Sequence, residues 1–206
     1  QEKIGVPNGV TNIKTPKSPL ILSIGEPKHK APAFIKGIIN KNFSEWQKYP
    51  PTLGLEKLNI ACIKWLIRRY NLPKNFLKAN NNIVQVAGTR EGLFNIALAL
   101  SPNKINNKKP MILMPDPFYQ VYLGAARFSG AKPILVESLK ENRFVPSFHN
   151  LDKNILKKTT IIYVCTPSNP EGTALNIKDW DKIINISRKY NITIISDECY
   201  SDIYFN

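Results

Sequence analysis

The sequence lacks any apolar run that approaches the roughly 20 residues needed to cross a bilayer. It also lacks a basic-then-apolar leader with a small-residue cleavage site. With 43% hydrophobic content over 206 residues, the chain can bury one sizeable core. These features are typical of an ordinary soluble globular protein, and we expect a cytoplasmic location and no membrane partner.

Cysteine and histidine are scarce, with three and two residues respectively. Cys62, Cys165 and Cys199 lie far apart, and no CxxC pair or metal-ligand spacing links them to His29 or His149. The sequence therefore predicts no metal site. Because free cysteine is among the most often buried residues, we expect three reduced thiols in the core.

Acidic residues are outnumbered by basic ones, 15 against 29, which gives a formal net charge of +14. Such a charge favours polyanions when lysine and arginine cluster in a recognition motif. Here the lysines are scattered among asparagines and isoleucines, and no such motif accompanies them. We therefore expect no nucleic-acid partner, although a basic field favours acidic small molecules.

Apolar strands alternate with helical segments along most of the chain. The strand-like runs are "PLILSIGEP", "IVQVAG", "PMILMP", "KPILVE", "TTIIYVCTP" and "ITIISDECY". Continuous apolar strands that alternate with helices predict a mainly parallel sheet covered on both faces, an α/β fold. Before them, Leu55, Leu58, Cys62 and Trp65 recur at three- and four-residue intervals, which predicts one buried helix face.

The unusual residues follow the predicted strands, and ligands of open α/β sheets bind beyond the carboxyl ends of strands. Gly88, Thr89 and Arg90 open a helix, whose free amides and positive dipole favour a phosphate. Glycine serves packing alone in many such turns, so that alternative stays open. Further on, Tyr119 offers a ring for a planar ligand or for the core, whereas Tyr122 is expected in the core.

Two other predicted strand ends carry an amide and a carboxylate. Pro167 and Pro170 flank Asn169 and fix the backbone from which its amide extends. Asp197 follows a fully apolar strand, with Tyr200 three residues later. A buried carboxylate is costly without a partner such as a cation or a protonated heterocycle nitrogen, although Asp also caps turns. An anion cradle, a stacking ring, an aimed amide and a buried carboxylate together resemble a pyridoxal phosphate site.

Six motifs carry a wider resemblance: "LSIGEP", "YPPTLGLEKL", "VAGTREGLF", "PDPFYQVYLGAARFSGAKP", "CTPSNPEG" and "SDECYSDIYF". In this order they resemble the fold-type-I, class I/II aminotransferases. The resemblance implies a small-domain piece at residues 1–30 and an incomplete cofactor-binding large domain at residues 31–206. Several phrases are most similar to bacterial N-succinyldiaminopimelate aminotransferase of lysine biosynthesis.

The resemblance also implies a role for each cofactor-binding residue. The backbone amides of Thr89 and Arg90 would hold the phosphate of pyridoxal 5'-phosphate, and the Tyr119 ring would stack on the pyridine. Asp197 would pair with the ring nitrogen. The ring 3-oxygen would accept hydrogen bonds from Asn169 and Tyr200.

Other implied contacts lie outside this set. Gly25 and Asn169 would approach the substrate carboxylate, and Tyr49 would reach the phosphate of the neighbouring subunit in a homodimer. Where the family usually has Asn-Pro-Thr-Gly, this chain has Glu171 in the third place, and we expect that side chain to point to solvent.

The resemblance places the Schiff-base lysine beyond Asn206, so we expect a fragment without a catalytic residue that does not transaminate alone. The expected activity of the full-length enzyme is transfer of an amino group between amino and keto acids. Three alternatives stay open: another aminotransferase, a β-eliminating lyase, and a lysine-less, non-catalytic module.

Overall fold

The computed structural model describes residues 29–105 and 107–203. These residues fall into two compact units, one that extends to Pro51 and one that begins at Thr52. The strand predicted in "PLILSIGEP" lies outside the described residues, and the domain division at residues 30 and 31 stays a prediction.

The first unit is helical in its described part. Helix α1 spans Ala33–Lys41, and the short 3-10 helix η1 spans Phe43–Gln47. Every described residue of this unit is exposed. The described part of this unit therefore contributes no buried side chain to a core.

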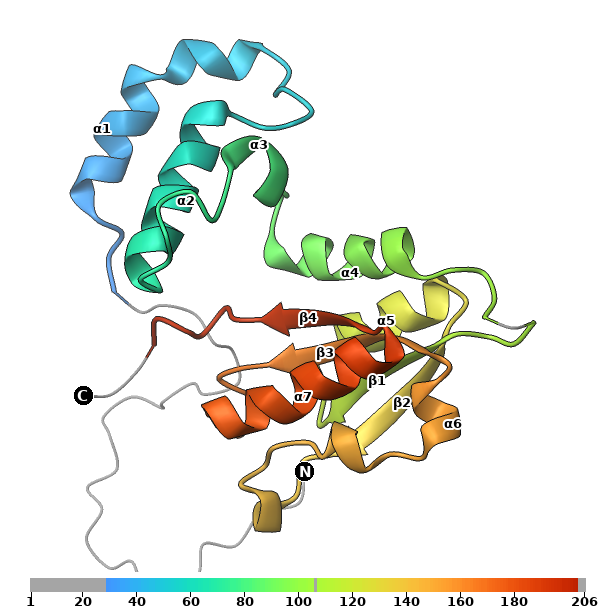
Figure 1. The fold of residues 1–206 in the computed structure, drawn as a ribbon. Helices are drawn as coiled ribbons and strands as arrows, with labels where there is room; N and C mark the ends of the chain where they lie inside the picture. Colours follow the sequence, from blue (N-terminus) through green and yellow to red (C-terminus); the bar gives the residue numbers. More distant parts are fainter. Residues whose placement is uncertain (1–28, 106, 204–206) are drawn as a thin grey trace, which may run out of the picture. The chain divides into compact units, whose positions relative to one another are not determined.

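A parallel sheet forms the centre of the second unit (Figure 1). Its strands are β1 (Met111–Asp116), β2 (Lys132–Glu137), β3 (Thr159–Cys165) and β4 (Thr193–Asp197). They follow the order β2-β1-β3-β4, and every pair is parallel. The pairing of Cys165 with Asp197 brings the carboxyl ends of β3 and β4 to one edge. The prediction of a mainly parallel α/β sheet is confirmed.

Helices connect the strands and precede the sheet. The longer ones are α2 (Glu56–Arg69), α4 (Thr89–Leu100), α5 (Gln120–Phe128) and α7 (Ile177–Tyr190). The short ones are α3 (Ala79–Asn82), α6 (Lys153–Leu156), η2 (Lys140–Asn142) and η3 (Phe148–Asn150). Asn176 and Asp179 form a capping box at the start of α7, which satisfies amides that the first turn leaves unpaired.

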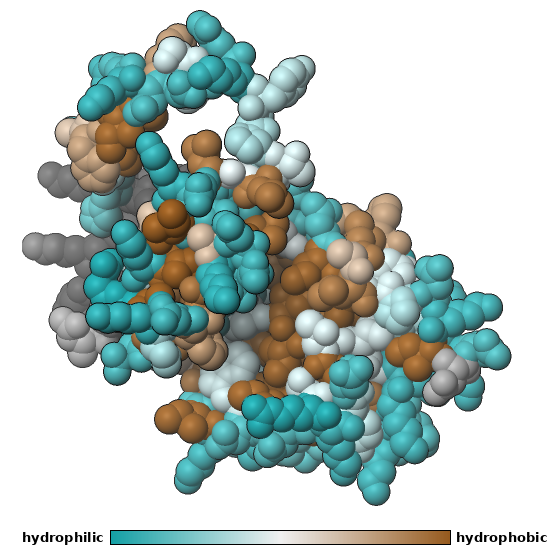
Figure 2. Space-filling view, turned by 45° about the horizontal axis from the view of Figure 1, so that its top comes forward, coloured by the Kyte–Doolittle hydropathy of each residue, from teal (hydrophilic) through white to brown (hydrophobic). Residues whose placement is uncertain are grey.

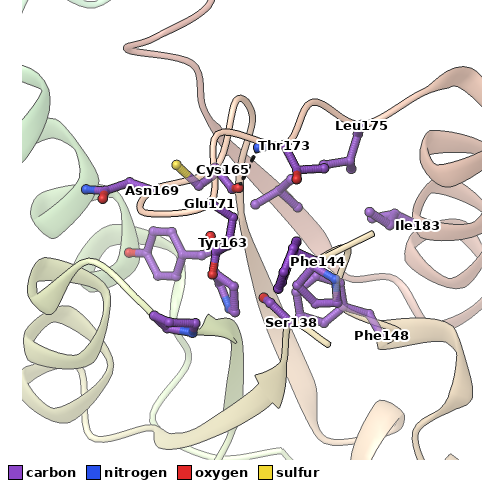
Figure 3. A pocket seen from close by; sticks show the side chains of 15 residues that line it. Ser138, Phe144, Phe148, Tyr163, Cys165, Asn169, Glu171, Thr173, Leu175 and Ile183 are labelled. Atoms are coloured by element: carbon purple, nitrogen blue, oxygen red, sulfur yellow. Dashed lines mark hydrogen bonds between the residues drawn. The ribbon is translucent and has the colours of Figure 1, made fainter. Parts of the chain in front are cut away.

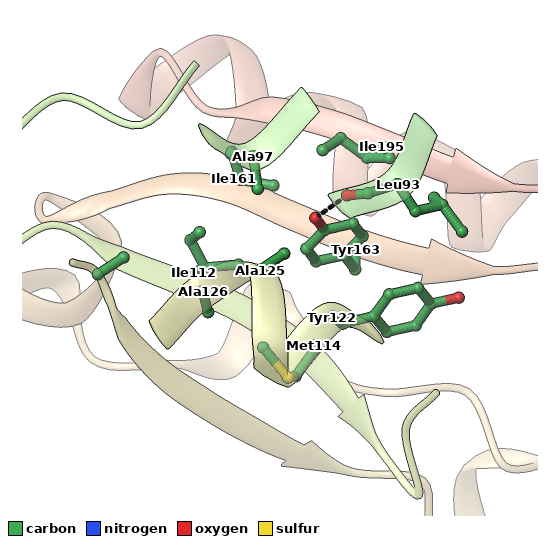
Figure 4. Packing of buried hydrophobic residues seen from close by; sticks show 11 residues of the cluster. Leu93, Ala97, Ile112, Met114, Tyr122, Ala125, Ala126, Ile161, Tyr163 and Ile195 are labelled. Atoms are coloured by element: carbon green, nitrogen blue, oxygen red, sulfur yellow. Dashed lines mark hydrogen bonds between the residues drawn. The ribbon is translucent and has the colours of Figure 1, made fainter. Parts of the chain in front are cut away.

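Both faces of the sheet are covered by helices, and each face has its own core. On one face, α4 and α5 pack through Leu93, Ala97 and Ala125 against strand residues such as Tyr163 (Figure 4). On the other face, α7 packs through Ile183 against the strands. The second core consists of Leu113, Val136, Phe148, Leu156, Ile162, Val164, Ile183, Ile186 and Ile192.

The segment "IVQVAG" is not a strand in the structure, so this prediction is wrong. Strands need a hydrogen-bonded neighbour, and none of the described strands pairs with residues 83–88. The side chain of Gln85 instead donates to the Leu55 carbonyl at 2.9 Å and to Asn59 Oδ1 at 2.8 Å. Val84 and Val86 remain largely exposed.

The predicted buried face of α2 is also wrong in detail. Leu55, Leu58 and Trp65 are exposed, whereas Asn59 and Ile63 are buried. The hydrogen bond from Gln85 explains the inward position of Asn59, because it satisfies a buried amide oxygen. The buried side of α2 therefore includes a polar residue, which apolar periodicity alone does not select.

Hydrophobic side chains also remain on the surface of the described residues. Brown areas on the face drawn in Figure 2 show them between teal hydrophilic areas. Phe128 and Val84, for example, are mostly exposed. None of the helices in the described part of the chain is long and apolar enough to cross a membrane.

Candidate functional site

A cavity of about 160 Å³ lies at the carboxyl ends of β1, β3 and β4. Its wall contains Thr89, Leu93, Pro115, Tyr119, Tyr122, Cys165, Asn169, Asp197, Cys199 and Tyr200. Five of these residues were predicted from the sequence as site residues: Thr89, Tyr119, Asn169, Asp197 and Tyr200. Residues that are as many as 111 positions apart in the chain therefore meet at one edge of the sheet.

The first turn of α4 forms one wall of this cavity through Thr89. Gly88 is the N-cap residue, and no side chain caps the helix start. A Cβ built on Gly88 would meet no heavy atom within 4 Å, so packing among the described residues does not require glycine here. Uncapped amides and an open approach are suited to an anionic group.

Arg90 does not line the cavity, although it follows Thr89 directly. Its side-chain Nε donates a hydrogen bond of 2.8 Å to the hydroxyl of Tyr119. The Tyr119 ring also meets the Tyr122 ring edge-on, with 5.8 Å between centroids. Two neighbours from different helices therefore hold the ring that faces the cavity, and no sequence pattern indicates the Arg90 contact.

Asp197 is the one acidic side chain that the described residues place on the cavity wall, and it is only 7% exposed. Its Oδ2 accepts a hydrogen bond of 2.6 Å from the Tyr122 hydroxyl, and its Oδ1 accepts one of 3.3 Å from the Cys199 amide. The second bond is the turn cap weighed from the sequence. The hydrogen bond from Tyr122 was not predicted, because Tyr122 was expected only to pack in the core. Its hydroxyl could have indicated the bond, since a buried tyrosine hydroxyl usually has a hydrogen-bond partner.

Burial shifts the titration of the groups around Asp197. It raises the pKa of Tyr122 far above the ordinary range, and the hydrogen bond to Asp197 adds to the shift. Desolvation, followed by the charge of Asp197, raises the pKa of Cys199 to about 11. Burial likewise raises the pKa of Cys165. At neutral pH these phenol and thiol groups are therefore uncharged.

The three cysteines are free thiols, but they do not all lie in the core. Cys165 is buried, Cys62 is partly buried and Cys199 is exposed. The expectation of three core thiols is therefore wrong for Cys199. Cys199 follows the end of β4, where the chain leaves the sheet and turns along the cavity.

Asn169 lies on a loop that is fixed by its own hydrogen bonds. Ser168 and Thr173 exchange two of them, at 2.8 and 3.0 Å, and the Leu175 amide donates to Thr166 at 3.0 Å. Figure 3 shows the Asn169 amide pointing away from Phe144. Among the described residues, no hydrogen-bond partner meets that side-chain amide, so it remains available to a ligand.

A second, much smaller cavity of about 10 Å³ shares Pro115, Cys165 and Asn169 with the first (Figure 3). Glu171 lines it together with Ser138, Phe144 and Phe148. The side chain of Glu171 is partly buried, so the expectation that it points to solvent is wrong. The aromatic residues of the η2–η3 connection form a wall beside it, which the sequence of the Asn-Pro turn alone does not indicate.

Besides Arg90, two predicted site residues cannot be assigned to this cavity. Tyr49 belongs to the first unit, where it is fully exposed. Gly25 lies outside the described residues. Within the described ranges, no group of three or more His, Cys, Asp or Glu side chains is arranged to hold a metal ion.

Comparisons with known proteins all identify aminotransferases as relatives. A family model described as aminotransferase class I and II matches residues 17–206. An LL-diaminopimelate aminotransferase of Aquifex aeolicus (strain VF5) is 30% identical over 185 residues, which cover 89% of this chain and 46% of the relative. An aspartate aminotransferase of Pyrococcus horikoshii is 30% identical and is matched over 87% of this chain and 44% of its own.

The structural comparison agrees with these matches. A crystal structure of an aminotransferase from Neisseria meningitidis Z2491 superposes with a TM-score of 0.81 and 38% identity. The match covers 89% of this chain and 45% of that chain. The chain thus spans about half the length of the relatives it matches.

Proposed function

Because the chain belongs to the class I and II aminotransferases, a family that depends on pyridoxal phosphate, we propose that the 160 Å³ cavity holds this cofactor in the full-length protein. The observation that carries the proposal is the position of Asp197. Its carboxylate is buried at the carboxyl end of β4, and the described residues of the cavity wall include no other acidic group.

The residues of the cavity fit both charged ends of the cofactor. At one end, the uncapped amides of Thr89 and Arg90 at the start of α4 suit the phosphate. At the other end, Asp197 suits a protonated ring nitrogen, because a buried carboxylate favours an adjacent cation. Both ends lie on the wall of one cavity, through Thr89 and Asp197.

The remaining wall residues fit the ring between those ends. Tyr119 would stack on its face, while Asn169 and Tyr200 would donate hydrogen bonds to its 3-oxygen. When bound, the cofactor supplies an electron sink for the charge that develops at the substrate α-carbon. The protein groups orient the ring and keep a negative charge beside its nitrogen.

The proposed activity of the full-length protein is the transfer of an amino group between an amino acid and a keto acid. N-succinyl-LL-2,6-diaminopimelate with 2-oxoglutarate is the proposed pair, as in lysine biosynthesis. The support is the similarity of "LSIGEPKH", "FYQVYLGAA" and "DECYSDIYF" to N-succinyldiaminopimelate aminotransferase. Relatives named LL-diaminopimelate aminotransferase support a diaminopimelate skeleton. Gly25 and Asn169 would approach the substrate carboxylate.

A homodimer is part of the same proposal. Tyr49 would reach the phosphate in the neighbouring subunit, and its complete exposure leaves the hydroxyl accessible for such a contact. The cytoplasmic location is likewise proposed, as expected for lysine biosynthesis.

Steady-state assays of the full-length protein with pyridoxal phosphate test the activity. Four amino donors are compared with 2-oxoglutarate as acceptor: N-succinyl-LL-2,6-diaminopimelate, LL-diaminopimelate, L-aspartate and L-alanine. The highest kcat/KM is expected for the succinylated donor. A higher value for free LL-diaminopimelate would reject the succinyl substrate alone, and glutamate formation from none of the donors would reject the proposed activity.

A further inference from the structure

Two stacked tyrosines lie between the α4/α5 layer and the sheet (Figure 4), and one of them, Tyr122, also lines the cavity. The rings of Tyr122 and Tyr163 are fully buried, 4.4 Å apart between centroids and inclined by 10°. Their hydroxyls have different acceptors at the same distance of 2.6 Å. Tyr163 donates to the backbone carbonyl of Leu93, and Tyr122 donates to the carboxylate of Asp197.

The Asp197 carboxylate is held by two donors from two parts of the chain. The hydroxyl of Tyr122, on α5, binds Oδ2, and the amide of Cys199, after β4, binds Oδ1. A carboxylate has about four acceptor positions, so these two bonds leave positions for a ligand. They also fix the plane of the carboxylate, because each oxygen has its own partner.

Tyr122 is itself firmly placed. One ring face stacks on Tyr163, and the Tyr119 ring lies against it edge-on at 88°. Burial raises the pKa of the Tyr122 hydroxyl, which therefore keeps its proton and remains a donor. The hydroxyl cannot rotate away from Asp197 without breaking its 2.6 Å hydrogen bond to Oδ2.

We propose that Tyr122 is a positioning residue, an inference that rests on the proposed cofactor site. Its hydroxyl sets the orientation in which the Asp197 carboxylate meets the ring nitrogen of bound pyridoxal phosphate. Tyr163, in the same stacked pair, supports packing without acting on that carboxylate, so the pair offers a matched control.

Two ligands distinguish a loss of Asp197 orientation from a general loss of packing. They are pyridoxal phosphate and its carbocyclic analogue, in which C–H replaces the ring nitrogen. Dissociation constants are measured for the full-length protein by fluorescence titration. The wild type is expected to prefer pyridoxal phosphate by about 30-fold, as a charge-assisted hydrogen bond provides. A loss of packing would lower the affinity for both ligands by the same factor and leave this preference unchanged.

The Tyr122→Phe variant keeps the ring and its stacking but removes the hydroxyl. It is expected to lower the preference by about fivefold, the effect of one neutral hydrogen bond. Tyr163→Phe is expected to keep the wild-type preference. An unchanged preference in Tyr122→Phe, or an equal loss in both variants, would overturn the positioning role.

Failure of the proposed cofactor site gives a different result, because the wild type would then bind neither ligand or bind both equally. A wild-type NMR measurement does not depend on folded variants. With tyrosine labelled by carbon-13 at Cζ, the Tyr122 signal is expected to shift more with pyridoxal phosphate than with the carbocyclic analogue. Equal shifts with the two ligands would contradict the inference.

Discussion

The two faces of the sheet have different cores. The face covered by α7 is filled with aliphatic side chains and Phe148. The face covered by α4 and α5 includes Tyr122 and Tyr163, whose hydroxyls make short hydrogen bonds. Polar contacts thus occur on the face that continues into the cavity. The two cores therefore differ in role: both stabilise the fold, and the one on the α4/α5 face also orients side chains for a ligand.

The largest expected effect is on the aliphatic face. Ile162 is fully buried there on β3, so Ile162→Ala should lower the free energy of unfolding by about 3 kcal/mol through lost contacts and a residual cavity. Urea unfolding of the full-length protein measures this loss. Cofactor affinity should stay within about twofold of the wild type. The lost contacts and the void left by the smaller side chain lower the stability of the fold and do not change the cofactor site. A tenfold loss of affinity would break the comparison.

The next effect concerns the carboxylate on the opposite face. Asp197→Asn should weaken pyridoxal phosphate binding by about 30-fold, because a charge-assisted hydrogen bond becomes a neutral one. Asp181→Asn, the same change at an exposed position of α7, serves as the control and should leave affinity unchanged. Equal affinities of the two variants, measured by absorbance titration, would remove Asp197 from the site.

A smaller effect is expected for the second buried hydroxyl. Tyr163→Phe removes the hydrogen bond to the Leu93 carbonyl and should cost about 1 kcal/mol of unfolding free energy. The ring stacking on Tyr122 should survive, since it does not require the hydroxyl. Thermal unfolding measures the loss; a stability above that of the wild type would show that this bond does not support the layer.

The smallest expected effect is at the ion pair between Arg143 and Asp179, near the start of α7. Arg143→Asn should cost about 0.5 kcal/mol at neutral pH, because the arginine is more than half exposed. Asparagine suits the left-handed backbone at this position.

The pH dependence of that pair has a definite sign. Partial burial opposes ionisation of Asp179, but the Asn176 amide and the Arg143 guanidinium outweigh it and hold the pKa of Asp179 below its usual value. The stabilisation is therefore present above the ordinary carboxyl pKa and is lost as pH falls through the lower, folded value. Unfolding at neutral and acid pH should show a cost of Arg143→Asn that disappears in acid; a constant cost would contradict the ionic origin.

The alternation of apolar strands with helices was sufficient to predict the four observed strands and the helices that cover them. It was not sufficient for "IVQVAG", because local pattern does not reveal whether a strand has a partner. In the cavity, position after a strand identified Asp197 and Asn169. Spacing placed Tyr122 in the core but gave no acceptor for its hydroxyl, since that acceptor lies 75 residues away. Contacts between distant residues were the part that sequence patterns could not supply.

The central claim is that one cavity accommodates the phosphate at α4 and the ring nitrogen at Asp197. A crystal structure of the full-length protein with pyridoxal phosphate tests it most directly. We expect the phosphate within hydrogen-bond distance of the Thr89 and Arg90 amides and the ring nitrogen facing the Asp197 carboxylate. A cofactor bound elsewhere, or a ring whose nitrogen points away from Asp197, would contradict the account.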